Sequence, residues 1–69
     1  MNIQEQEDYR KTILENASKE TPKDIFDLVN GIGTWATWEA LTACEYLVAE
    51  GFLAIHSEPR THDKLYVKA

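Results

Sequence analysis

The chain has 69 residues, of which 12 are acidic and seven are basic, so its formal net charge is −5. A chain of this length supports one hydrophobic core, and we expect a single domain over residues 1–69. Its apolar runs are far shorter than the roughly 18 residues of a membrane-spanning helix. The polar, acidic N-terminus does not have the pattern of a secretory signal. These features argue against a membrane partner and favour a cytoplasmic protein.

The charge is divided unevenly along the chain. Residues 1–50 carry ten carboxylates and four cations, whereas residues 51–69 carry two carboxylates and three cations. Such a chain binds nucleic acid only if the basic C-terminal part, or a dimer, concentrates positive potential. Without that concentration, the acidity favours a protein partner.

The first predicted element is a helix from residue 2 to about residue 17. Tyr9, Ile13 and Ala17 recur every four residues with Leu14 beside them, which gives one apolar stripe on a helix. Residues 18–20 are interpreted as a linker able to supply a short edge strand.

The second predicted helix is about nine residues long and has the best-marked start in the chain. Thr21 is a favourable N-cap, Pro22 a favourable first helical residue, and Asp24 stands where a carboxylate reaches back to the cap. Gly31 is expected to end the helix in a left-handed conformation. Its buried stripe is expected to consist of Ile25, Phe26, Leu28 and Val29.

The third predicted helix follows the turn Gly31-Ile32-Gly33 and ends before Gly51. Either Thr34 or Thr37 is suited to cap it. Small residues in its first half allow close approach to its neighbours. Its inward stripe is expected to consist of Ala40, Ala43, Cys44, Leu47 and Val48.

A β-hairpin is predicted at the C-terminus, with strands at residues 52–55 and 65–67 around a polar loop at residues 56–63. Period-two alternation predicts that four apolar side chains cover the helices, with Phe52 and Tyr66 completing the core from the edge. Those four are Leu53, Ile55, Leu65 and Val67. We expect Leu53, Ile55 and Leu65 to be buried together with Leu47.

Catalytic chemistry finds little support, and we expect no enzyme, cofactor or metal. Cys44 is the only cysteine and lies on a helical core stripe, so it is interpreted as a small buried hydrophobe. His56, His62 and Asp63 are more typical of an exposed loop than of a metal site. Gly31-Ile32-Gly33 follows a helix and lacks the rest of a nucleotide-binding motif, so it is interpreted as a turn.

The predicted order of helix, helix, turn, helix and glycine-led hairpin resembles the winged helix-turn-helix family. The resemblance implies a mainly helical α+β fold and a dimeric transcriptional regulator of bacterial, archaeal or phage type that binds double-stranded DNA. In that family the second helix of the pair enters the major groove. The resemblance implies that DNA is contacted there by Thr34, Thr37, Trp38 and Thr42, and at the hairpin by Arg60 and Lys64 on phosphates.

The chain departs from this pattern in one respect. Residues 34–50 contain three glutamates and neither lysine nor arginine, although phosphate contacts usually supply much of the affinity for DNA. The rival hypothesis is therefore a winged helix that binds another protein through Trp38, Leu41 and Glu45. Trp38 points outward if Ala40, Ala43 and Leu47 point inward, and it joins Trp35 in the core if the helical phase differs by one residue.

Overall fold

A computed structural model of the chain describes residues 3–57 and 64–69. It contains three helices followed by an antiparallel hairpin, which is the predicted α+β layout and is consistent with a winged helix. The helices are α1 (Ile3–Asn16), α2 (Ile25–Leu28) and α3 (Thr37–Ala49), and the strands are β1 (Leu53–Ser57) and β2 (Leu65–Lys68). Within these described ranges, no helix has the length and apolar character needed to cross a bilayer.

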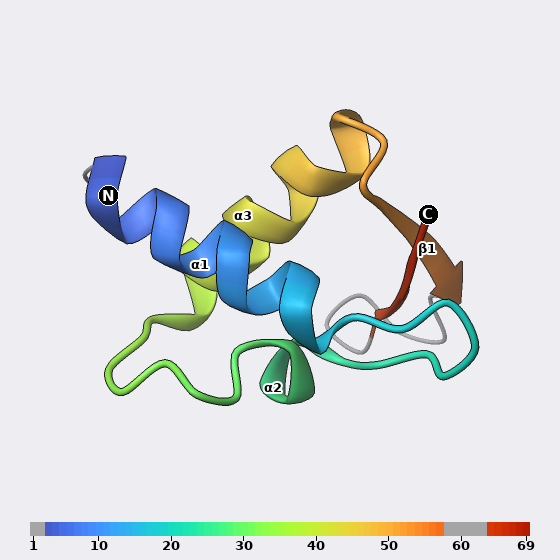
Figure 1. Ribbon diagram of the computed structural model, residues 1–69, viewed down its shortest axis with the longest axis horizontal. Coiled ribbons are helices and arrows are strands. Elements are labelled where there is room, and N and C mark those ends of the chain that lie inside the picture. The colour runs from blue at the N-terminus through green and yellow to red at the C-terminus, as the bar shows by residue number, and fades with distance from the viewer. Residues whose placement is uncertain (1–2, 58–63) are drawn as a thin grey trace.

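The buried core lies between the three helices and the hairpin. α1 and α3 pack against each other across the middle of the molecule, and β1 follows α3 to the end that also holds the C-terminus (Figure 1). The Tyr9 hydroxyl accepts a hydrogen bond from the Ala36 backbone N–H at 3.1 Å, so the core also holds the start of α3. The buried residues are Tyr9, Ile13, Ile25, Leu28, Val29, Ala40, Ala43, Cys44, Leu47, Leu53 and Tyr66.

Helix α2 is shorter than predicted, because the chain is extended where the helix was expected to begin. Lys23 exchanges two backbone hydrogen bonds with Tyr66 of β2, at 2.9 and 2.8 Å. An extended Lys23 forbids helix at Thr21 and Pro22, so Asp24 is the N-cap and its carboxylate accepts from the Asp27 N–H at 3.0 Å. The prediction that Thr21 caps a nine-residue helix is therefore wrong.

The side chain of Phe26 also differs from prediction. It is 62% exposed rather than buried, because Ile25, Leu28 and Val29 face the core and Phe26 lies about 100° from Ile25 around the helix. Its ring packs edge-on against Trp35, with ring centroids 5.7 Å apart.

Helix α3 begins at Thr37, and neither predicted threonine caps it. Its N-cap is Ala36, which makes no side-chain capping hydrogen bond. The hydrogen bond from Ala36 to Tyr9 fixes the helix start instead. In the preceding turn Gly31 has a positive φ as predicted, +108°, but α2 already ends at Leu28 with Val29 as its C-cap. The Ile32 N–H donates to the Val29 carbonyl at 3.0 Å.

The inward face of β2 differs from the prediction. Tyr66 is buried, whereas its neighbours Leu65 and Val67 are only half-buried. Tyr66 pairs with Ile55 on one side and with Lys23 on the other, so it lies at the centre of the sheet. Because side chains alternate between faces, a buried Tyr66 turns its two neighbours to the outer face.

Further predictions for the hairpin and its edge are corrected. Ile55 is 41% exposed and Phe52 is exposed, so neither belongs to the core. The strand also continues through His56 to Ser57, with a bulge between Ile55 and Ser57 that disrupts the alternation there. The linker supplies no edge strand at residues 18–20, although the Ser18 carbonyl accepts from the Lys68 N–H at 2.9 Å.

Candidate functional site

The surface of helix α3 opposite the core is the main candidate site. Ala40, Ala43, Cys44 and Leu47 are completely buried, which fixes the rotation of the helix. Trp38 therefore faces outward and is 64% exposed, so the prediction of an outward Trp38 is confirmed and its core alternative is wrong. We call the surface made by Trp38, Thr42, Glu45 and Tyr46 the outer face of α3.

The outer face borders a shallow groove against helix α1. Gln6 of α1 and three residues spaced one helical turn apart on α3, Trp38, Thr42 and Tyr46, line the groove. Tyr46 is 51% exposed. The Thr42 hydroxyl donates to the Trp38 carbonyl at 2.8 Å within the helix. The small threonine thus stands between two large exposed aromatic rings.

Sequence reasoning missed Tyr46 and Gln6. The spacing of Trp38 and Tyr46 at i and i+8 was a signal for Tyr46, since residues four apart share one side of a helix. Nothing in the sequence pointed to Gln6, because its place depends on how α1 crosses α3. Leu41 of the rival hypothesis is half-buried and packs against the core, so it offers less surface than Trp38.

Charge around the outer face is negative. Helix α3 carries Glu39 and Glu45 and contains no lysine or arginine. Arg10 of α1 reaches Glu50, just after α3, and donates from both guanidinium nitrogens to the two carboxylate oxygens, with Nη2 3.2 Å from Oε2. The hydrogen bond raises the pKa of Arg10 and lowers the pKa of Glu50. This cation is therefore already paired with a carboxylate.

The residues expected to contact DNA are only partly brought together. Thr37, Trp38 and Thr42 lie on the first two turns of α3. Thr34 is exposed in the preceding loop, where it shares a hollow with Glu5, Trp35 and Glu39. Lys64 is half-buried immediately before β2, and Arg60 lies outside the described residues.

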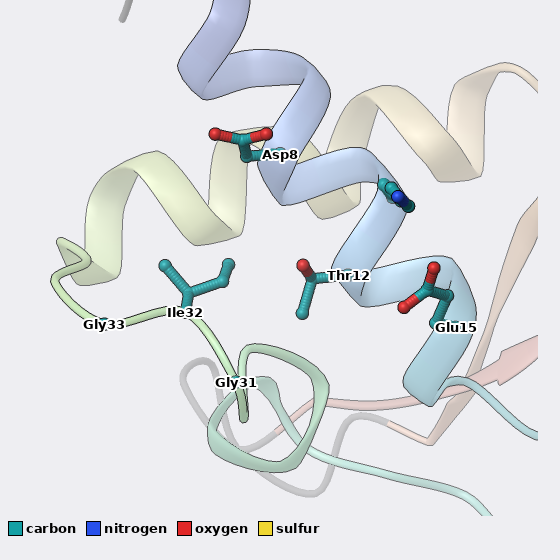
Figure 2. Close-up of a pocket in the computed structure, with 7 residues that line it drawn as sticks. Asp8, Thr12, Glu15, Gly31, Ile32 and Gly33 are labelled. Carbon is teal, nitrogen blue, oxygen red and sulfur yellow. The ribbon is translucent and has the colours of Figure 1, made fainter.

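A second hollow lies between α1 and the turn at Gly31. It is lined by Asp8, Lys11, Thr12 and Glu15 of α1 and by Gly31-Ile32-Gly33. Figure 2 shows Ile32 extending from the turn toward α1, where Asp8, Thr12 and Glu15 succeed one another along the helix. The hollow holds two carboxylates, Asp8 and Glu15, and one cation, Lys11, so its charge disfavours a bound phosphate. This agrees with the interpretation of the glycines as a turn.

Cys44 has the surroundings of a structural residue. It is completely buried, and burial raises the pKa of its thiol to about 12. A thiol with so high a pKa is a poor nucleophile at neutral pH. The described ranges contain no cluster of three or more metal-binding side chains, and the predicted loop residues His62 and Asp63 lie outside them.

Comparisons with known proteins found no match for this chain. No protein-family model matches the chain, and no significant match was found among curated proteins or solved structures. The function of the chain is therefore inferred from the geometry and charge of the described surface.

Proposed function

We propose that this chain is a winged-helix module that binds another protein through the outer face of α3. The observation that carries the proposal is the exposure of Trp38, 64%, on a helix that has two carboxylates and no cation. Tryptophan is among the residues that contribute most to protein interfaces, because its large rigid surface is desolvated on binding. Tyr46 extends the same surface along the groove.

The same features weaken a DNA-binding role for α3. A helix in the major groove lies between two phosphate backbones, so carboxylates without compensating cations are repelled there. The Thr42 hydroxyl already donates its proton to the Trp38 carbonyl, so it has no second proton to donate to a base edge. These points support the hypothesis that α3 binds a protein over the hypothesis that it binds DNA.

Binding of double-stranded DNA as a dimer is the second candidate. It is favoured by the order of the elements and by the lysines at the hairpin end, where Lys23 and Lys68 lie on neighbouring backbone segments. Under this candidate, Arg60→Ala and Lys64→Ala each weaken binding to any duplex and reduce its salt slope by about one unit. Thr37→Ala and Thr42→Ala instead change sequence preference.

Site-specific photocrosslinking tests the proposed function. The photoreactive residue p-benzoylphenylalanine replaces Trp38 in the full chain, and a matched chain carries it at the exposed Lys19, in the linker after α1. Irradiation of cells that express each chain is followed by separate protease and nuclease digestion of the adducts. We expect a protein adduct from position 38 that position 19 does not give. Adducts with nucleic acid alone, or no adduct above the position 19 control, would overturn the proposal.

A further inference from the structure

We propose that the groove between α1 and α3 receives an arginine-bearing segment of the partner protein. This inference deepens the proposed function and rests on it. The groove offers two exposed aromatic rings, Trp38 and Tyr46, on one side of α3 and two helical turns apart. The eight residues from Trp38 to Tyr46 correspond to about 12 Å along a helix. Thr42 lies between the rings and leaves room there for an inserted side chain.

The charge of the surroundings selects a cationic occupant. Glu45 is exposed on the outer face beside this groove, and Glu7 is exposed on α1 next to the groove residue Gln6. Arg10, the cation of α1 on this side, is held by Glu50. Glu7 also attracts Arg10, so three carboxylates on these described residues, Glu7, Glu45 and Glu50, stand against one cation. The net charge beside the groove is therefore negative, and an acidic segment or a nucleic acid is repelled.

A second copy of the chain is a poor occupant for the same reason. A two-fold symmetric interface places the same surface on both subunits, so the acidic surface that carries Glu45 and Glu7 would face an equally acidic surface. Like charges brought together at an interface oppose association. The surface that complements the groove must be basic, and the groove surface of a second copy is acidic.

Arginine fits the groove better than lysine. A guanidinium ion stacks on the face of tryptophan or tyrosine, and its planar donors pair with a carboxylate at the same time. Trp38 supplies the ring and Glu45, seven residues later on the same side of α3, supplies the carboxylate. A lysine ammonium makes both contacts less well, because it has no plane to stack on the ring and no fixed fork of donors.

The test is a titration with defined peptides. A fluorescein-labelled peptide of alternating arginine and leucine is titrated with the full chain at low salt, and its anisotropy is followed. Matched peptides carry lysine or the uncharged analogue citrulline in place of arginine. We expect saturable binding of the arginine peptide, weaker binding of the lysine peptide, and no binding of the citrulline peptide.

Matched variants assign the binding to the groove. Trp38→Leu and Glu45→Gln should each weaken binding by about twofold to fivefold, the range of one exposed cation–π contact or ion pair. Glu15→Gln removes the same charge from α1 at the hollow beside Gly31 and should leave the affinity unchanged. Equal losses in Glu45→Gln and Glu15→Gln would show attraction to net charge alone and overturn the inference.

A second measurement reports on the groove directly. The Trp35→Phe variant leaves Trp38 as the sole tryptophan, and its emission should change on addition of the arginine peptide. Equal binding of the citrulline peptide, or no binding of any peptide, would overturn this inference. A protein adduct from position 38 in the crosslinking experiment would still stand in that case, so the two failures are distinguishable.

Discussion

Trp38 and Leu47 lie on opposite sides of one helix, and their substitutions should separate interface from core. Trp38→Ala removes a largely exposed side chain, so the thermal midpoint of the isolated domain should stay nearly constant, as for other surface substitutions. Leu47→Ala empties a completely buried site and should cost about 2–5 kcal/mol of unfolding free energy. Denaturation followed by circular dichroism measures both.

The two variants test different claims about α3: Trp38→Ala tests its outer face and Leu47→Ala tests its packing. A large drop in the midpoint of Trp38→Ala would place that side chain in the core and remove the interface hypothesis. A negligible effect of Leu47→Ala would contradict the packing of α3 itself.

The exposure of Trp38 was predictable from its neighbours, whereas the short length of α2 was not. Three small buried residues, Ala40, Ala43 and Cys44, set the phase of α3 and leave one direction for Trp38. The residues around α2 fit a helix of nine residues as well as one of four. Only the backbone pairing of Lys23 with Tyr66, distant in sequence, delays the start of that helix to Ile25.

The hairpin shows a similar limit. Both its strands and the apolar character of β2 follow from the sequence. The face that β2 turns inward does not, because Leu65-Tyr66-Val67 is apolar or aromatic at every position and so lacks a clear period of two. Tyr66 is the buried residue of the three, and its backbone lies between Ile55 of β1 and the distant segment at Lys23.

The turn between α2 and α3 should depend on one of its two glycines. Gly31 has φ +108°, a conformation that costs a residue with a Cβ about 1–3 kcal/mol, so Gly31→Ala should lower the unfolding free energy by that amount. Gly33 has no positive φ, and a methyl group on its Cα would meet no described atom beyond its chain neighbours within 4 Å. Gly33→Ala is therefore the matched control and should be close to neutral. Chemical denaturation of both variants checks this difference, and equal effects would contradict the described turn.

The contact between Arg10 and Glu50 ties α1 to the end of α3, and its pH dependence has a defined sign. Because the pKa of Glu50 is lowered in the folded chain, this pair stabilises the fold above the ordinary carboxyl range. That stabilisation is lost as the pH falls through the lowered pKa of the folded chain. Arg10→Gln should return the pKa of Glu50 toward its ordinary value, measured by NMR titration of the side-chain carboxyl carbon. An unchanged titration curve would show that the pair does not form in solution.

Charge separates the two functional hypotheses better than the fold does. The layout of three helices and a hairpin fits both a DNA-binding protein and a protein-binding module, and the sequence predicted that layout. The sequence also revealed that residues 34–50 lack cations. It could not show that Arg10 is engaged by Glu50 or that Trp38 and Tyr46 border one groove, because both depend on the crossing of α1 over α3.

The most direct test of the protein-binding hypothesis is a ¹⁵N–¹H NMR titration of the full chain with a pool of mixed-sequence DNA duplexes at low salt, where electrostatic attraction is strongest. Two indole signals, from Trp35 and Trp38, report beside the backbone amides. We predict that the amides of α3 and the Trp38 indole stay unshifted. Saturable shifts of the Trp38 indole together with the amides of Thr37 and Thr42 would show that α3 contacts DNA and would contradict that hypothesis.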